Sequence, residues 1–407
     1  MNHEPYRPPL DPPPFEPVHV RRCIRTNVRI QNHDNREEVL ILTSVTSAVD
    51  TFLNAHNDDV NIQNEDMDDG DVDDDEDDDS DDGSDISESS SSSSSSYDDM
   101  EEQEKEEGDR GSDRSVNNQV VNRMRAYWPR GDPLCVNPHG EFQTHIYYAR
   151  VVQRADLNWI TTDEEVALKR VSWQCIRAAQ NRLSEDVIKE ISALKYLSDF
   201  LGDNGTSMVD AHILTADIVM SDESYLYLVM PYCAGGDMCM RVAFAEERRL
   251  SEDESRAFFR QILKGLETMQ RARICHKDLS PENLILLDDK SLVIDFGMCL
   301  RIPYSANGRH LITPRIACGK RQHLAPEIIR RHPFDGHAVD IWAAGTILLF
   351  MLTGMRFEYP PLYDRVLDNV DLGVSNEAMD ILRRMFRLSP NDRMSLEEIR
   401  NHPFLQG

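Results

Sequence analysis

Residues 276–297 read HKDLSPENLILLDDKSLVIDFG and carry polar side chains at the ends of two short apolar runs. The runs at 284–287 and 291–294, separated by a polar turn, predict the two strands of a hairpin. Because a hairpin brings its ends together, we expect Asn283 and Asp295 to meet in space. Both supply oxygen donors of the kind that Mg²⁺ prefers beside nucleotide phosphates. The pattern therefore predicts a magnesium and phosphate site beside this hairpin.

Two segments upstream are candidates for holding a nucleotide. Residues 164–171, EEVALKRV, alternate and predict a strand with Ala167 and Lys169 on one face. That face suits a flat base packed near a phosphate held by an ammonium, although a surface lysine on an edge strand is the alternative. Residues 184–201 carry apolar residues at helical spacing and predict a helix. Glu190 at the edge of its apolar stripe is either a solvated flank or the partner that fixes Lys169 on phosphate oxygens.

The segment 225–230, YLYLVM, predicts a buried strand that leads into a turn with two glycines. Backbone groups leaving such a strand can hydrogen-bond an adenine edge, and Asp237 can reach a ribose hydroxyl. The alternative is an ordinary strand and turn. Further along, Asp278 lies just before the first strand of the hairpin, where it is free to orient a substrate hydroxyl and accept its proton.

Together these segments resemble the eukaryotic protein kinase superfamily, nearer its serine/threonine branch, over roughly Gly140 to Leu405. The motifs that carry the resemblance are, in chain order, VALK at 166–169, Glu190 in KEISAL, HKDLSPEN at 276–283, DFG at 295–297, APE at 325–327, DIWAAG from Asp340, Arg393 as the partner of Glu327, and HPF at 402–404. The resemblance implies an α+β, two-lobed fold, with a small mainly-β lobe carrying one helix, a larger mainly-α lobe, and a disordered acidic region before them.

The resemblance also implies an activity: transfer of the γ-phosphate of ATP, with Mg²⁺, to serine or threonine hydroxyls of protein substrates. The implied roles are Asp278 as base or substrate orienter, Asn283 and Asp295 as metal ligands, Lys169 on the α- and β-phosphates with Glu190 as its partner, His276 as a structural residue under Phe296, and Gly140, Ala167, Met230, Cys233, Asp237 and Ile285 as further nucleotide-binding residues. Tyrosine specificity is disfavoured because SPEN keeps the Pro-Glu-Asn of the serine/threonine form.

Three positions depart from the pattern of the superfamily. The glycine-rich loop should fall in NPHGEFQTHIYYARVV, which holds only Gly140, so looser nucleotide clamping is expected. Ser280 stands where these enzymes have a lysine on the transferring phosphate, a loss of about 3 kcal/mol by analogy with oxyanion-hole donors. Lys320 stands where they have a threonine that contacts the catalytic aspartate. We expect Lys320 to deliver an ammonium to the same volume; the alternative is a pseudokinase scaffold that binds nucleotide weakly or not at all.

Charge is distributed unevenly along the 407 residues, whose formal net charge is −29. From Asp58 to Arg114, 27 Asp and Glu face 3 Lys and Arg, a net of −24, which leaves −5 for the rest of the chain. This segment has almost no apolar residues with which to offset chain entropy. It predicts an acidic, serine-rich disordered linker over 58–125, either a solvated spacer or a docking tail for a basic partner.

Outside the linker, two further regions are expected. Residues 1–57 begin with a proline-rich stretch and predict a mostly disordered arm. The kinase-like domain is expected at 133–405, a length sufficient for its own core. Since such a domain does not need a tether that cannot pack, deletion of residues 1–125 is expected to leave turnover within a few fold.

Cysteine usage and hydropathy indicate in which cellular compartment the protein is expected. Eight cysteines are scattered without a CxxC pair or a Cys/His metal spacing, which predicts reduced thiols in a cytoplasmic or nuclear protein. The N-terminus lacks the apolar core of a signal peptide. The longest apolar stretch, IWAAGTILLFMLTG at 341–354, is too short to span a bilayer. We expect a soluble monomer whose partners are ATP and protein substrates, with no nucleic acid or membrane among them.

Overall fold

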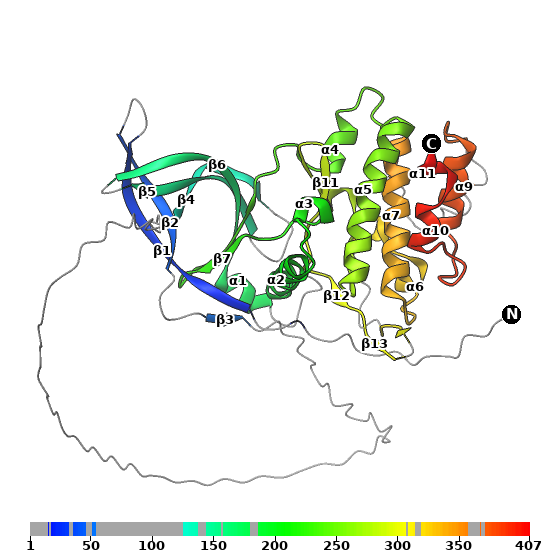
Figure 1. Ribbon diagram of the computed structural model, residues 1–407, viewed down its shortest axis with the longest axis horizontal. Coiled ribbons are helices and arrows are strands. Elements are labelled where there is room, and N and C mark those ends of the chain that lie inside the picture. The colour runs from blue at the N-terminus through cyan, green and yellow to red at the C-terminus, as the bar shows by residue number, and fades with distance from the viewer. Residues whose placement is uncertain are drawn as a thin grey trace, which may run out of the picture. The chain divides into compact units, whose positions relative to one another are not determined.

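The structure is a computed structural model that describes residues 15, 18–31, 36–45, 51–53, 125–136, 144–155, 158–179, 186–306, 308–313, 319–356, 367 and 371–407. The described residues within 1–59 and 123–407 form one compact unit. Gly140 and all but the last residue of the predicted acidic linker lie outside the described residues. Within the unit a β-rich lobe is followed by a helical lobe, as predicted for the kinase-like fold (Figure 1).

The β-rich lobe is a curved sheet with helix α2 as its long helix. Two short helices, α1 and α3, flank α2 in the chain, whereas one helix was expected in this lobe. Its elements are β1 Val18–Gln31, β2 Arg36–Val45, β3 Thr51–Leu53, β4 Arg125–Val136, β5 Thr144–Ala155, β6 Asn158–Ser172, α1 Trp173–Ala179, α2 Val187–Asp203, α3 Met208–Ala211, β7 Ile218–Ser221 and β8 Tyr225–Pro231. Eight strands pair in the order β2-β4-β5-β6-β8-β7-β1-β3, and an additional β1–β2 pairing joins seven of them into a closed ring. Ring closure pairs strand edges that an open sheet would expose.

The N-terminal residues correct one prediction. Residues 1–57 were expected to be a mostly disordered arm, yet β1, β2 and β3 form within them. Strand β1 pairs antiparallel with β2 and parallel with β7, where Arg21 faces Met220. Phe15 and Val20 are buried in the main core. Since these residues belong to the sheet and the core, we expect deletion of residues 1–125 to destabilise the fold and no longer expect it to be harmless.

The helical lobe carries the loops of the candidate site. Its elements are α4 Met238–Ala243, α5 Glu252–Arg271, β9 Ile274–Cys275, η1 Pro281–Asn283, β10 Leu284–Leu287, β11 Lys290–Val293, β12 Leu300–Arg301, β13 Tyr304–Ser305, β14 Gly308–Arg309, η2 Arg321–His323, α6 Pro326–Ile329, α7 Gly336–Thr353, α9 Asn376–Met385, α10 Leu396–Arg400 and α11 Pro403–Gln406. The predicted hairpin is present as β10 and β11, with the second strand one residue earlier than expected.

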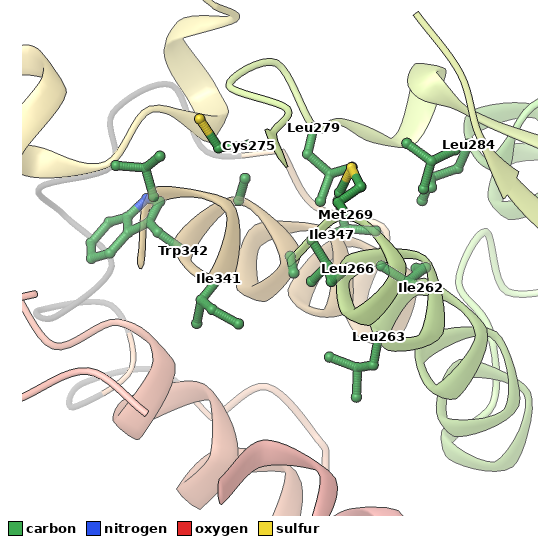
Figure 2. Packing of buried hydrophobic residues seen from close by; sticks show 14 of the residues in the cluster. Ile262, Leu263, Leu266, Met269, Cys275, Leu279, Leu284, Ile341, Trp342 and Ile347 are labelled. Atoms are coloured by element: carbon green, nitrogen blue, oxygen red, sulfur yellow. The ribbon is translucent and has the colours of Figure 1, made fainter. Parts of the chain in front are cut away.

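Helices α5 and α7 form the centre of this lobe. Figure 2 shows apolar side chains of the two helices packed together, among them Leu266 and Met269 of α5 and Ile347 of α7. Leu279, in the segment between β9 and η1, and Leu284, the first residue of β10, belong to the same cluster. Residues 276–283, which by the resemblance to kinases form the catalytic loop, are thereby fixed to a close-packed core, in which small volume changes are costly.

Helix α7 is the one described helix that is long and apolar enough to cross a membrane by length and composition. It begins at Gly336, before the apolar stretch noted in the sequence. Of its 18 residues, 89% lie buried inside the protein. A helix that is apolar on all sides and surrounded by protein is typical of a core helix.

Candidate active site

Strand β6 and helix α2 bring the first pair of charges together. Val166 and Leu168 of β6 pack into the sheet core, which turns Lys169 to the opposite face. There the Lys169 Nζ lies 2.8 Å from Oε1 and 2.5 Å from Oε2 of Glu190. Both residues are buried. The alternatives of a solvated Glu190 and a surface lysine are therefore excluded, and the predicted pair is confirmed.

Helix α2 holds Glu190 in place through its cap and its apolar stripe. Asp186 is the N-cap, and its carboxylate accepts hydrogen bonds from the Ile188 and Lys189 backbone amides. The predicted stripe residues Ile191 and Leu194 are buried. Burial raises the pKa of Glu190 against the opposing effect of the Lys169 charge. A buried carboxylate of this kind needs its cation, because removing one partner leaves an uncompensated charge.

The catalytic-loop segment joins the two polar groups at the hairpin. The Asn283 Nδ2 donates to the Asp278 backbone oxygen at 2.8 Å and to Asp278 Oδ2 at 3.1 Å. Across the hairpin, the Ile294 amide donates to the Asn283 carbonyl at 3.0 Å. Asp295 follows directly, in the left-handed backbone region at φ 66°. Asn283 and Asp295 are thus brought to one end of the hairpin, as the sequence predicts.

Buried residues on α7 and at the start of the catalytic loop hold this loop in position. Asp340 of α7 is buried and accepts hydrogen bonds from the backbone amides of His276 and Lys277, at 2.7 and 3.0 Å. Burial raises the pKa of Asp340 to about 6. The His276 ring packs on Phe296 with centroids 5.0 Å apart, and its Nε2 lies 2.9 Å from the Ile294 carbonyl. His276 therefore has the structural position expected for it.

Lys320 reaches the catalytic loop from the facing segment. Its backbone amide donates to Asp278 Oδ1 at 2.9 Å, and its Nζ donates to Ser280 Oγ at 2.7 Å. Gly319 makes this approach possible: it has φ 111°, and an added Cβ would lie 2.8 Å from the Lys277 carbonyl. Ser280 is fully buried. The structure thus brings the ammonium of Lys320 to the side chain that replaces the usual lysine.

The predicted nucleotide-binding residues lie along β6, β8 and the following turn. Ala167 of β6 pairs with Met230 of β8. Met230 and Ile285 pack against a cluster that contains buried Cys233. Asp237 caps α4, and its Oδ1 accepts from the Met240 amide at 2.8 Å. Gly140, which the sequence also predicts here, lies outside the described residues.

The APE segment is fixed by the predicted ion pair. Arg393 donates from its two terminal nitrogens to the two carboxylate oxygens of Glu327, at 2.8 and 3.0 Å. The Arg393 side chain has no exposed surface, and its guanidinium also lies over the Trp342 ring. A two-point contact of this geometry is specific for arginine with a carboxylate. It holds the segment that follows Lys320 on the helical lobe.

Two features of the site were not predicted. Glu282, inside the SPEN motif, contacts Lys320 at 3.4 Å and Arg356 at 2.6 Å. Phe15 packs on Tyr196 of α2. All three pairs join residues far apart in the chain, so no local pattern could have revealed them. Among the described residues, no group of three His, Cys, Asp or Glu side chains is placed to hold a metal.

Residues 153–405 match the protein kinase domain family. The chain is 31% identical over 255 residues to the carbon catabolite-derepressing protein kinase of Secale cereale. This alignment covers 60% of this chain and 47% of that protein. It is 33% identical over 251 residues to the SNF1-like protein kinase ssp2 of Schizosaccharomyces pombe, and that alignment covers 60% of this chain and 40% of the relative. It is 34% identical over 202 residues to the SNF-related serine/threonine-protein kinase of Homo sapiens, covering 46% and 25%.

The chain spans less than half the length of each of these curated relatives. The family match itself extends over more than half of this chain and includes Lys169, Glu190, Asp278, Asn283 and Asp295. In the structure Lys169 contacts Glu190 and Asn283 contacts Asp278, and Asp295 lies close enough to Glu190 for its charge to help raise the pKa of that carboxyl. On the match and the geometry together, the chain belongs to the protein kinase family.

Proposed function

We propose that this protein transfers the γ-phosphate of ATP, with Mg²⁺, to serine or threonine hydroxyls of protein substrates. The observation that carries the proposal is the buried Lys169–Glu190 ion pair. A buried ion pair is an inefficient way to stabilise a fold, because desolvation offsets its attraction. Its presence is best explained by a use for the ammonium, and binding phosphate oxygens is the use that the neighbouring residues support.

The residues present fit a magnesium nucleotide. Because the Asn283 Nδ2 is the atom that donates to Asp278, the amide oxygen of Asn283 is not the atom that contacts that residue. One carboxylate and one amide oxygen are hard donors suited to Mg²⁺. Bound Mg²⁺ and ATP would supply the phosphoryl group and neutralise its charge. The protein would contribute Lys169 on the phosphates and Asp278 on the substrate hydroxyl.

Lys320 is proposed as the cation that stabilises the phosphate during transfer. Its Nζ lies within hydrogen-bond distance of Ser280 Oγ. Ser280 replaces the lysine that supplies this charge in the kinases that the chain resembles. An ammonium aimed at developing charge in a partly buried site contributes more than it would in water. The Lys320 side chain is 40% exposed, so it has room to turn toward a phosphate.

The same proposal extends to the affinity for nucleotide, to the acceptor hydroxyl and to the location of the protein in the cell. With Gly140 as the single glycine of its loop, the protein is expected to clamp nucleotide loosely and to show a raised KM for ATP. Serine/threonine specificity is supported by the Pro-Glu-Asn at 281–283 and by the relative named as a serine/threonine-protein kinase. A cytoplasmic or nuclear location is supported by free cysteines at the seven described cysteine positions.

The test is phosphate transfer by the purified full chain. With Mg²⁺, ATP and a serine-containing peptide we expect turnover that falls about 10²- to 10⁴-fold in Asp278→Asn, because the group that orients the hydroxyl is lost. Asp295→Ala should be equally inactive. Asp289→Asn, a matched change on the exposed turn of the same hairpin, should keep the parental rate. Transfer that survives both Asp278→Asn and Asp295→Ala contradicts the proposal.

The second candidate is a pseudokinase scaffold, and the observation that favours it is the buried, uncharged Ser280. It predicts nucleotide binding without transfer. Calorimetry with Mg²⁺ and ATP on the same preparations separates the two: binding with no turnover supports the scaffold, and turnover sensitive to Asp278→Asn supports the kinase.

A further inference from the structure

The carboxylate of Glu282 is held between two cations of its own chain. Arg356, which follows helix α7, donates from Nη1 to Glu282 Oε1 at 2.6 Å. Lys320 donates from Nζ to Glu282 Oε2 at 3.4 Å. Each carboxylate oxygen therefore has its own positive partner. We call Glu282, Lys320 and Arg356 the charge triad; it carries two positive charges and one negative.

Arg356 is positioned by contacts other than Glu282. Its Nη2 lies 2.6 Å from the Sγ of Cys239 on α4. Its guanidinium lies 5.0 Å from the centre of the Phe350 ring, in a cation–π arrangement. These contacts from two elements fix the guanidinium before any ligand arrives. The neutralisation of Glu282 is thus built into the fold.

The ionisation of Glu282 agrees with this arrangement. Partial burial raises its pKa, but the charge of Lys320, a hydrogen bond from the residue's own backbone amide, and the charge and hydrogen bond of Arg356 together outweigh that effect. The pKa of Glu282 therefore falls to about 2. Glu282 is charged at neutral pH and is already compensated. A basic side chain brought to this place would meet two cations before it gained from the carboxylate.

The triad lies next to the point where a substrate hydroxyl would be held. The backbone amide of Lys320 donates to Asp278 Oδ1 at 2.9 Å, while the side chain of the same residue reaches Glu282. Asp278 and the triad are therefore separated by the length of one lysine side chain. A peptide whose hydroxyl rests on Asp278 must place its neighbouring residues beside the triad. All three side chains are between 32% and 40% exposed, so they are accessible to it.

We propose that the charge triad is a substrate-specificity site that favours an acidic residue, and disfavours a basic one, close to the phosphorylated serine or threonine. The inference rests on the proposed kinase function and names the class of substrate. Complementary charge at the rim of a site selects partners by attraction and by the repulsion of wrong ones. Arg356 is its specificity-determining residue, because it neutralises Glu282 without belonging to the catalytic group.

The test uses the full chain and a series of peptides. Each contains one serine, and the peptides differ only by Glu, Ala or Arg at one of the four positions on either side of it. For the parent, kcat/KM should be higher with Glu than with Arg at one or more positions. Arg356→Gln exposes the charge of Glu282. It should shift the ratio of kcat/KM for the Glu and Arg peptides about fivefold in favour of Arg, which is the effect of one partly exposed ion pair. Higher salt should weaken the preference.

Two variants serve as controls. Arg400→Gln removes an arginine of α10 that pairs with Glu267 at 2.9 Å, and it should leave the preference unchanged. In the double variant Arg356→Gln with Glu282→Gln there is no carboxylate to expose, so the shift seen in Arg356→Gln should be lost. A double variant that keeps the full shift contradicts the role of Glu282.

Equilibrium binding of the same peptides, followed by fluorescence anisotropy, needs no transfer. The specificity site would be overturned if the parent bound and phosphorylated Glu and Arg peptides equally well, or if it preferred Arg. It would also be overturned if Arg356→Gln left the ratio of kcat/KM for the Glu and Arg peptides unchanged. A preference for Glu in binding, altered by Arg356→Gln but without transfer in any preparation, would support the specificity site and overturn the proposed function alone.

Discussion

Phe15 packs edge-on against Tyr196, with ring centroids 5.8 Å apart and ring planes at 63°. Tyr196 belongs to helix α2, which also carries Glu190. The Tyr196 hydroxyl donates to the Ala272 carbonyl at 3.0 Å, and the Arg301 guanidinium lies 5.0 Å from its ring. The N-terminal residues are therefore linked through α2 to the helical lobe. A residue far outside the family match thus packs on the helix that carries Glu190.

Replacement of Phe15 by alanine should destabilise the protein. The side chain is 6% exposed and lies in the main core, so its removal should lower the free energy of unfolding by about 3 kcal/mol. Denaturant unfolding of the full chain measures this. Leu40→Ala is the matched control, since this apolar residue of the same N-terminal region is 47% exposed; its effect should stay within about 0.5 kcal/mol. Equal effects of the two changes would contradict the packing described for Phe15.

The acidic linker and the N-terminal strands should differ in their importance. Replacement of residues 60–122 by a Gly/Ser linker of equal length should leave peptide turnover within a few fold, because the original segment has almost no apolar residues with which to pack. Deletion of residues 1–59 should instead cause a large loss of stability, since β1 and β2 close the sheet. Steady-state kinetics and thermal unfolding of both variants check this. A linker replacement as damaging as the deletion would show that the acidic segment supports the catalytic domain.

His323 should make stability fall in mild acid. It is buried, its Nδ1 lies 2.5 Å from Thr346 Oγ1, and burial lowers its pKa from 6.5 to about 4. The unfolded chain thus binds a proton at a higher pH than the folded one, so the stability it contributes is complete above pH 6.5 and is lost as the pH falls toward 4. Between pH 7.5 and 5.5 this loss is about 1 kcal/mol.

The measurement is denaturant unfolding at those two pH values for the parent and for His323→Gln. His337, whose pKa is also lowered by burial to about 4, adds a similar loss in both proteins. The parent should therefore lose more stability than the variant. An identical pH dependence would mean that His323 titrates normally and is not buried as described.

Local patterns predicted much of the fold and the site. The alternation around Lys169, the helical stripe around Glu190 and the hairpin after Asn283 each reflect a short-range periodicity that tertiary packing reinforced. The ion pair of Arg393 with Glu327 followed from the resemblance to kinases. These predictions succeeded because sequence neighbours set the geometry and the contacts are those of a known motif.

The remaining features depend on pairings between distant segments. Strand β1 was missed because its partners include β7, and Arg21 faces Met220 across almost the whole N-terminal half of the chain. The contact of Arg356 with Glu282 joins the end of α7 to the catalytic loop. Neither pairing leaves a periodic signal in its own segment. For Lys320 the sequence indicated the position, and the structure added the hydrogen bond to Ser280.

The central claim is that Lys320 supplies the charge that Ser280 lacks, and a double-mutant cycle on kcat tests it most directly. Lys320→Thr should lower kcat about 10²-fold with little change in ATP binding, because the ammonium acts on the phosphate during transfer. Ser280→Lys alone should help little, since two ammonium groups would repel. Ser280→Lys with Lys320→Thr should recover at least tenfold of the loss, as expected for residues that share one task. Lys320→Thr at the parental kcat, or a double variant that equals the sum of the single effects in free energy, would contradict the account.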